Sequence, residues 1–87
     1  MDRQKIFNEL DKMLSIGDKK RIIGMSKSDF SLEQHFGLGI WIRNNYVYSA
    51  ESEEIGDYLN CGMIHPDNIS TQILKDYYDY LLNKEKA

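Results

Sequence analysis

The sequence predicts a small all-α protein, a compact bundle of four to five helices, from the spacing of its apolar residues at both ends of the chain. Apolar positions that recur every three to four residues, with polar residues between them, form one buried stripe on an amphipathic helix. The first such run is Ile6, Phe7, Leu10, Met13 and Leu14, and the last is Ile73, Leu74, Tyr77, Tyr78, Leu81 and Leu82. We therefore expect a first helix ending near Gly17 and a last helix running to about Asn83.

Short helices are expected between these two, because residues that cap helices punctuate the chain. Asp18 is expected to cap a helix that breaks near Gly24. Ser28 or Ser31 would begin the next one, since Ser31 and Gln34 have the spacing of a capping box.

A further helix is predicted to begin at Ser52 and to stop at Gly62, and Pro66 is expected to open the last helix. The two acidic residues after Ser52 would favour the positive end of the helix dipole. The residues expected on the buried face of this helix are Ile55, Tyr58 and Leu59.

The segment between His35 and Tyr48 fits two structures. Leu32, Phe36 and Ile40 fall near one helical face, which predicts a helix to about Asn44. Alternate apolar residues from Phe36 to Ile42, followed by two asparagines, would also fit a strand and a turn. We expect the helix, because a lone hairpin is only marginally stable. The alternative is an α+β fold with one hairpin at residues 38–49.

Length and composition indicate one domain over residues 1–87, with 41% hydrophobic and 29% charged residues. The net charge of −3 argues against nucleic-acid binding, which needs a basic surface. The chain has one cysteine, no signal-peptide pattern and no apolar run of membrane-spanning length, so we expect a cytoplasmic protein. A homo-oligomer would suit such a small core.

The densest group of candidate binding residues follows Trp41, where Arg43, Asn44 and Asn45 are consecutive. An arginine fork beside two amides can bind a carboxylate, a phosphate or a partner's backbone. The structural alternative is that the asparagines end a helix while the arginine lies along the surface.

His65 and Asp67 are the second group of candidate binding residues, on either side of the only proline. They could serve as a general-base pair, but a turn residue and a helix cap are the ordinary roles of these types. The two histidines and one cysteine match no metal-ligand spacing, and we expect no catalytic set, metal or cofactor.

Three further features lead to specific expectations. The segment Gly37-Leu38-Gly39 lacks the third glycine and the lysine of a phosphate loop, so its glycines indicate close packing. Cys61 has no basic neighbour in the sequence, which predicts a buried, unreactive thiol. Tyr80 falls off the apolar stripe, as do Asp76 and Asp79, and we expect it to be exposed as a contact for a partner.

Two motifs, HFGLGIWIRNN at residues 35–45 and GMIHPDNIS at residues 62–70, resemble those of a family of small bacterial proteins known as a domain of unknown function. The resemblance covers about residues 30–82 and implies a compact helical fold without a named activity. Where many members carry tryptophan after the two asparagines this chain has Tyr46, and it has Asn68 where a second aspartate is common.

Small size, acidity, many tyrosines and the lack of a catalytic set suggest a non-enzymatic protein that binds a protein partner. Such proteins include inhibitors, immunity proteins and anti-defence proteins. The alternatives are a protein that binds a nucleotide or another small anion, and a small hydrolase that uses His65. The candidate binding residues are Trp41, Arg43, Asn44, Asn45, His65 and Asp67.

Overall fold

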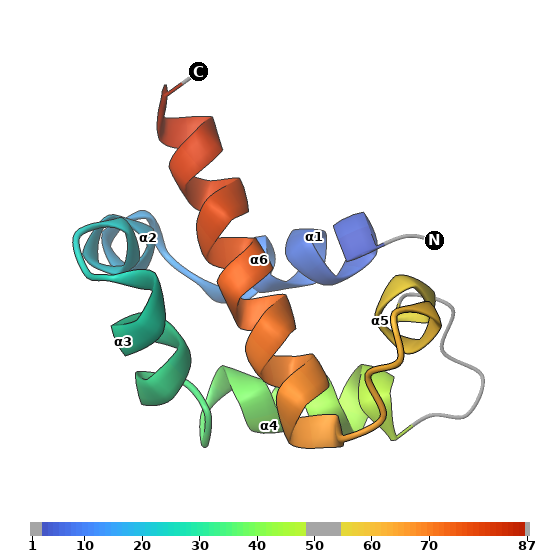
Figure 1. The fold of residues 1–87 in the computed structure, drawn as a ribbon. Helices are drawn as coiled ribbons and strands as arrows, with labels where there is room; N and C mark the ends of the chain where they lie inside the picture. The colour runs from blue at the N-terminus through green and yellow to red at the C-terminus, as the bar shows by residue number, and fades with distance from the viewer. Residues whose placement is uncertain (1–2, 49–54, 87) are drawn as a thin grey trace.

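Six α-helices and one π-helical turn form the fold in the computed structural model, which describes residues 3–48 and 55–86 (Figure 1). The predicted all-α class is confirmed, with one short helix beyond the four to five expected, and no strand occurs among the described residues. The elements in chain order are α1 (Arg3–Met13), α2 (Ile16–Ile23), α3 (Lys27–Glu33), α4 (Leu38–Ile42), η1 (Arg43–Val47), α5 (Gly56–Asn60) and α6 (Pro66–Lys86).

The long helix α6 is the centre of the core. It packs against α2, α3, α4 and η1 (Figure 1). Tyr77 of α6 contacts Phe7 of α1, and the Tyr58 hydroxyl of α5 donates to the Asp76 carboxylate of α6. The predicted period of this helix is confirmed, although it ends at Lys86 rather than near Asn83. Its buried side chains are Ile69, Ser70, Ile73, Leu74, Tyr77, Tyr78 and Leu81.

The N-terminal helices have most of the predicted apolar stripes, although Met13 is 46% exposed, and they have different caps. Helix α1 ends at Met13, and Ser15 caps α2 through a capping box in which the Asp18 N–H donates to the Ser15 Oγ at 3.0 Å. The Asp18 carboxylate in turn accepts from the Ser15 N–H at 3.1 Å. Gly17 therefore lies inside α2, and the predictions of a stop at Gly17 and a cap at Asp18 are wrong. The predicted end near Gly24 is confirmed.

Helix α3 begins earlier than predicted, because Ser26 rather than Ser28 or Ser31 is its cap. The Asp29 N–H donates to the Ser26 Oγ at 3.1 Å. This start brings Phe30 onto the face that packs against α6, where it is fully buried. Ser31 is buried within the helix, so its predicted role as a cap is wrong.

The segment that fits two sequence patterns is helical. Helix α4 continues into η1, and the Tyr48 N–H donates to the Arg43 carbonyl five residues earlier at 2.9 Å, as in a π-turn. The helical prediction is confirmed from Leu38 on and runs past Asn44 to Val47. The expected single helix from Ser28 or Ser31 is wrong, because a turn at residues 34–37 separates α3 from α4. The alternative hairpin is wrong over residues 38–48, while residue 49 lies outside the described residues.

The connection into α6 follows the predicted glycine and proline. Gly62 has φ +89°, which only glycine adopts without strain, and Pro66 is the first residue of α6. The Ile69 N–H donates to the His65 carbonyl at 3.0 Å, closing the first turn. The predicted start at Ser52 lies outside the described residues.

Two side chains near this connection differ from expectation. Leu59, predicted on a buried face, is half exposed, because the five-residue helix α5 turns only Tyr58 towards the core. Cys61, predicted to be buried, is exposed at the end of α5. Ile55, which precedes α5, is buried as predicted.

A polar cluster joins α1 to α6 through Asp11. The Tyr77 hydroxyl donates to Asp11 Oδ1 at 2.7 Å, and the Tyr80 hydroxyl donates to Asp11 Oδ2 at 3.1 Å. The Tyr80 ring also stacks on Tyr77 with centroids 5.8 Å apart. The prediction that Tyr80 is an exposed contact is therefore wrong, because Asp11 and Phe7 of α1 cover it.

This cluster makes stability depend on pH. Partial burial raises the pKa of the Asp11 carboxyl, but the two tyrosine hydroxyls and nearby lysines outweigh burial and hold the pKa below its ordinary value. A depressed carboxyl pKa stabilises the fold above the unfolded-state value of about 4, and this contribution is lost as the pH falls further. We expect Asp11→Asn to lower the free energy of unfolding at pH 7 and to matter much less at pH 2.5.

Urea unfolding of both proteins at the two pH values measures this effect. If Asp11→Asn lowers the free energy of unfolding equally at pH 7 and at pH 2.5, the charge of Asp11 does not contribute to stability.

Candidate functional site

Arg43 lies at the centre of a polar cluster that holds η1 against the start of α6. Its side chain is buried, with 6% exposure. Arg43 Nη1 donates to the Ser70 Oγ at 2.8 Å, and Nη2 donates to the His35 carbonyl at 3.0 Å. Its Nε lies 3.6 Å from Asp67 Oδ1. We call Arg43, Ser70, Asp67 and the His35 carbonyl the arginine cluster.

The cluster is closed by a second hydrogen bond and by a glycine. The Ser70 hydroxyl accepts from Arg43 and donates to the Asp67 carbonyl at 3.0 Å. A Cβ atom at Gly39 would lie 3.1 Å from the Gln34 carbonyl oxygen and 3.2 Å from Arg43 Nη1. Gly39 is therefore needed for the close approach of Arg43, which confirms the packing interpretation of the glycine motif.

The other predicted binding residues do not converge on Arg43. Asn44 and Asn45 are exposed, and the Asn45 amide donates to the Trp41 carbonyl at 2.8 Å. Trp41 is partly buried and packs edge-on against Tyr46 with centroids 5.7 Å apart. The structure thus joins Arg43 to Asp67 and turns both asparagines to solvent.

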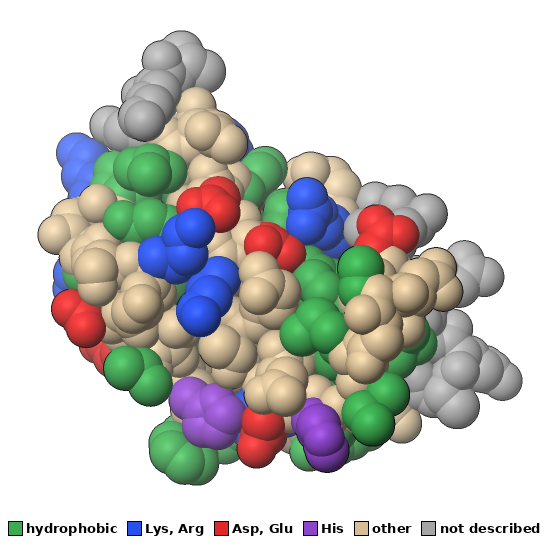
Figure 2. Space-filling model, in the orientation of Figure 1, with side chains coloured by type: hydrophobic (Ala, Val, Ile, Leu, Met, Phe, Trp, Pro, Cys, Tyr) green, Lys and Arg blue, Asp and Glu red, His purple; other side chains and the backbone are tan. Residues whose placement is uncertain are grey.

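The two histidines lie on the same face of the molecule, on either side of an acidic side chain (Figure 2). His65 is exposed, and its carbonyl closes the first turn of α6. No group of three or more histidine, cysteine or acidic side chains among the described residues could hold a metal ion. A small anion at Arg43 would have to displace the partners that lie at all three guanidinium nitrogens.

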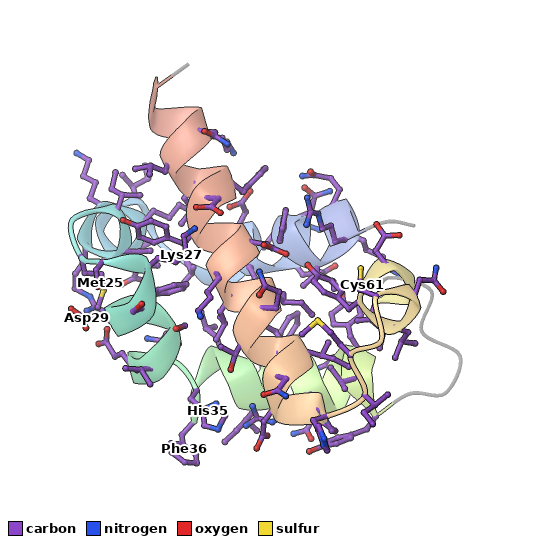
Figure 3. The ribbon with its side chains drawn as sticks, viewed as in Figure 1. Met25, Lys27, Asp29, His35, Phe36 and Cys61 are labelled. Atoms are coloured by element: carbon purple, nitrogen blue, oxygen red, sulfur yellow. The ribbon has the colours of Figure 1, made fainter. Side chains whose placement is uncertain are left out.

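An exposed apolar surface borders the arginine cluster at the turn between α3 and α4. Phe36 is 79% exposed, Leu32 is 74% exposed and Ile40 is 40% exposed. The Phe36 ring points away from the fold, beside His35, at the end of the molecule where α6 begins (Figure 3). We call Leu32, Phe36 and Ile40 the apolar corner.

The backbone that carries the apolar corner is held firmly. The His35 N–H donates to the Leu32 carbonyl at 3.4 Å, and the His35 carbonyl accepts from Arg43. The His35 ring packs edge-on against Phe36 with centroids 4.8 Å apart. Phe36 therefore projects from a turn that the arginine cluster fixes.

A family model described as a domain of unknown function, DUF6794, matches residues 4–81. The chain belongs to this family. The match covers nearly the whole chain, whereas the motifs noted in the sequence suggest a resemblance over about residues 30–82. No curated protein and no solved structure matches the chain.

The DUF6794 match includes the arginine cluster, the apolar corner and every helix up to the last turns of α6. Within the described part of this family member, no helix is both long enough and apolar enough to cross a membrane.

The sequence of this DUF6794 member indicates Arg43 as a candidate site residue. It does not indicate that Ser70 binds Arg43 or that Phe36 is exposed. The spacing of Leu32, Phe36 and Ile40 predicts a shared helical side, but the three residues lie in α3, in the turn after it and in α4, and all three are exposed. The opposite side of α4 is also apolar, and Ile42 on that side is fully buried. Periodicity alone cannot decide which of two apolar sides packs against α6.

Proposed function

We propose that this protein binds another protein through the apolar corner. The observation that supports the proposal is that Phe36, at 79% exposure, lies between two further exposed apolar residues, Leu32 and Ile40, around one turn of the chain. Exposed apolar groups that cluster on a soluble domain mark interaction surfaces more often than scattered single residues do. Aromatic side chains, phenylalanine among them, are also enriched in protein interfaces.

The fixed backbone of the corner also supports this proposal. Binding is weakened when flexible groups must be ordered, so a side chain already held in place binds more tightly. Arg43 holds the His35 carbonyl, and His35 packs against the Phe36 ring. In the proposed function Arg43 therefore acts inside the fold, and Phe36 makes the contact.

Acidic groups near the corner suggest the character of its rim. Asp29 is exposed on α3, and the Asp67 side chain is 69% exposed on α6. Glu33 forms an ion pair with Arg21 at 3.0 Å. Apolar centres surrounded by polar, charged rims are the usual arrangement of protein interfaces.

Affinity capture of the tagged protein from its own host tests the proposal. The variants are Phe36→Glu and, as a matched control, Leu59→Glu, which changes an apolar side chain that is 49% exposed on α5. We expect a stoichiometric partner that is lost with Phe36→Glu and retained with Leu59→Glu. If both variants retain the partner, or both lose it, the apolar corner is not the binding surface.

If the captured partner is an enzyme, its activity with and without the purified chain tests the inhibitory role that the sequence suggests. Capture of a second copy of the chain would instead indicate a homo-oligomer formed through this surface.

A further inference from the structure

A second surface, at the other end of α6, combines lysines with an apolar floor. A groove of about 250 Å³, open to solvent, lies between α2 and the C-terminal half of α6. Figure 2 shows hydrophobic side chains next to cationic ones beside the upper part of α6. We call this surface the lysine groove, and its described lining residues are Ile16, Lys19, Lys20, Ile23, Leu81 and Lys84.

The lysine groove is separate from the apolar corner. Leu81 lies three turns beyond Ser70 on α6, so the groove is roughly 16 Å along the helix axis from the arginine cluster. Different variants can therefore change the two surfaces independently, and an inference about the groove does not rest on the proposed function.

The floor and one wall of the groove are apolar. Leu81 is nearly buried and Ile23 is partly buried, so both form a fixed base. Ile16 is 75% exposed at the first position of α2, where its side chain has no structural need to be apolar. A ligand that covers Ile16 would remove this side chain from water.

The rim is cationic. Lys19 and Lys84 lie 3.5 and 3.6 Å from the Asp11 carboxylate, which holds both ammonium groups on the same side of the groove. Lys20 forms no ion pair within the described part of the chain. No acidic residue is among the described residues that line the groove. Three lysines against the one Asp11 carboxylate leave the rim cationic, on a chain with a net charge of −3.

We propose that the lysine groove binds an acidic amphipathic helix of a partner protein. One large aliphatic or aromatic side chain of that helix would pack on Ile16, Ile23 and Leu81. Carboxylates one turn away would meet Lys19, Lys20 and Lys84, since residues three and four apart share a helical face. Complementary charge favours this partner over an uncharged helix, and like-charge repulsion disfavours a basic one.

The size of the groove favours a side chain over a separate small molecule. Sites that enclose small ligands have volumes of about 300–1,000 Å³ and cover most of the ligand. The lysine groove is smaller and open, so it suits an anchor residue whose helix remains outside.

A peptide-display selection tests the proposal. The probe is a library of 16-residue helical peptides with one face randomised among acidic, basic, polar and large apolar residues. We expect wild-type protein to enrich peptides that combine Asp or Glu with a Leu, Ile or Phe anchor. For an enriched peptide, measured by fluorescence anisotropy, Ile16→Glu and Lys20→Glu should each weaken binding by about tenfold or more.

Matched controls are Ile64→Glu, an equally exposed isoleucine outside the groove, and Lys12→Glu, an exposed lysine on α1. Both should bind like wild type. Enrichment of basic or uncharged peptides, unchanged binding by Ile16→Glu, or no enrichment at all would overturn the proposal. Thermal stabilisation by laurate without peptide enrichment would assign the groove to a fatty acid. A dimer that is lost with Ile16→Glu would assign the groove to a second copy of the chain. Either result would also overturn the proposal.

Discussion

Replacing Arg43 with methionine is expected to lower the free energy of unfolding by about 3 kcal/mol, since hydrogen bonds to a charged group contribute about 1.5–3 kcal/mol each. Methionine keeps much of the apolar stem but loses the donors to Ser70 and to the His35 carbonyl. The substitution leaves the His35 carbonyl without the donor that Arg43 supplies, next to a side chain that is buried. Urea unfolding followed by circular dichroism measures the change.

Arg21→Met is the matched control for this experiment. Arg21 forms an ion pair with Glu33 at 3.0 Å, but both side chains are largely exposed. Exposed ion pairs contribute little, so the free energy of unfolding should change by less than about 1 kcal/mol. If Arg43→Met and Arg21→Met have similar small effects, Arg43 does not hold the fold as described.

This result would change how binding experiments on the protein are designed. Arg43 looks like a surface contact in the sequence, and its charge reversal would seem a natural way to abolish binding. Because a buried glutamate there would face the His35 carbonyl and approach Asp67, Arg43→Glu is expected to disrupt folding. Loss of a partner in that variant would not identify a surface.

Two phenylalanines in neighbouring segments are expected to differ strongly in how much the same substitution lowers the free energy of unfolding. Phe30 is fully buried on α3, with its ring centroid 6.3 Å from that of Tyr78. Phe30→Ala should lower the free energy of unfolding by about 3–5 kcal/mol, the usual effect of removing a buried aromatic ring. Phe36→Ala should change it by less than about 0.5 kcal/mol, because its ring is exposed.

Thermal and urea unfolding of the two variants are compared side by side. A large loss of stability with Phe36→Ala would mean that the ring is part of the core in solution. The apolar corner would then not be available to a partner.

The sequence identifies the helices better than it identifies their ends. The apolar period of α6 is long and regular, and its central residues are buried as that period predicts. The capping residues are harder to predict from the sequence. Several serines are followed, three positions later, by a residue that could complete a capping box. Ser15 with Asp18, and Ser26 with Asp29, form the observed cap contacts, while Ser31 does not. Packing of Phe30 against α6 selects Ser26.

The candidate site is also predictable only in part, because contacts between distant segments decide it. The chemistry of Arg43 is visible in the sequence, but its direction depends on Ser70, which lies 27 residues later. The exposure of Phe36 depends on the turn that separates α3 from α4 and on how both helices pack against α6. Both choices are made by contacts between distant segments, which local spacing does not encode.

Photo-crosslinking inside the host cell tests the central claim, that Phe36 contacts a partner protein, most directly. A photoreactive phenylalanine analogue is placed at position 36 in one protein and at position 59 in another, since both native side chains are exposed and apolar. We expect a discrete adduct with another protein from position 36 and none from position 59. Absence of an adduct at position 36, or the same adduct from both positions, would contradict the account.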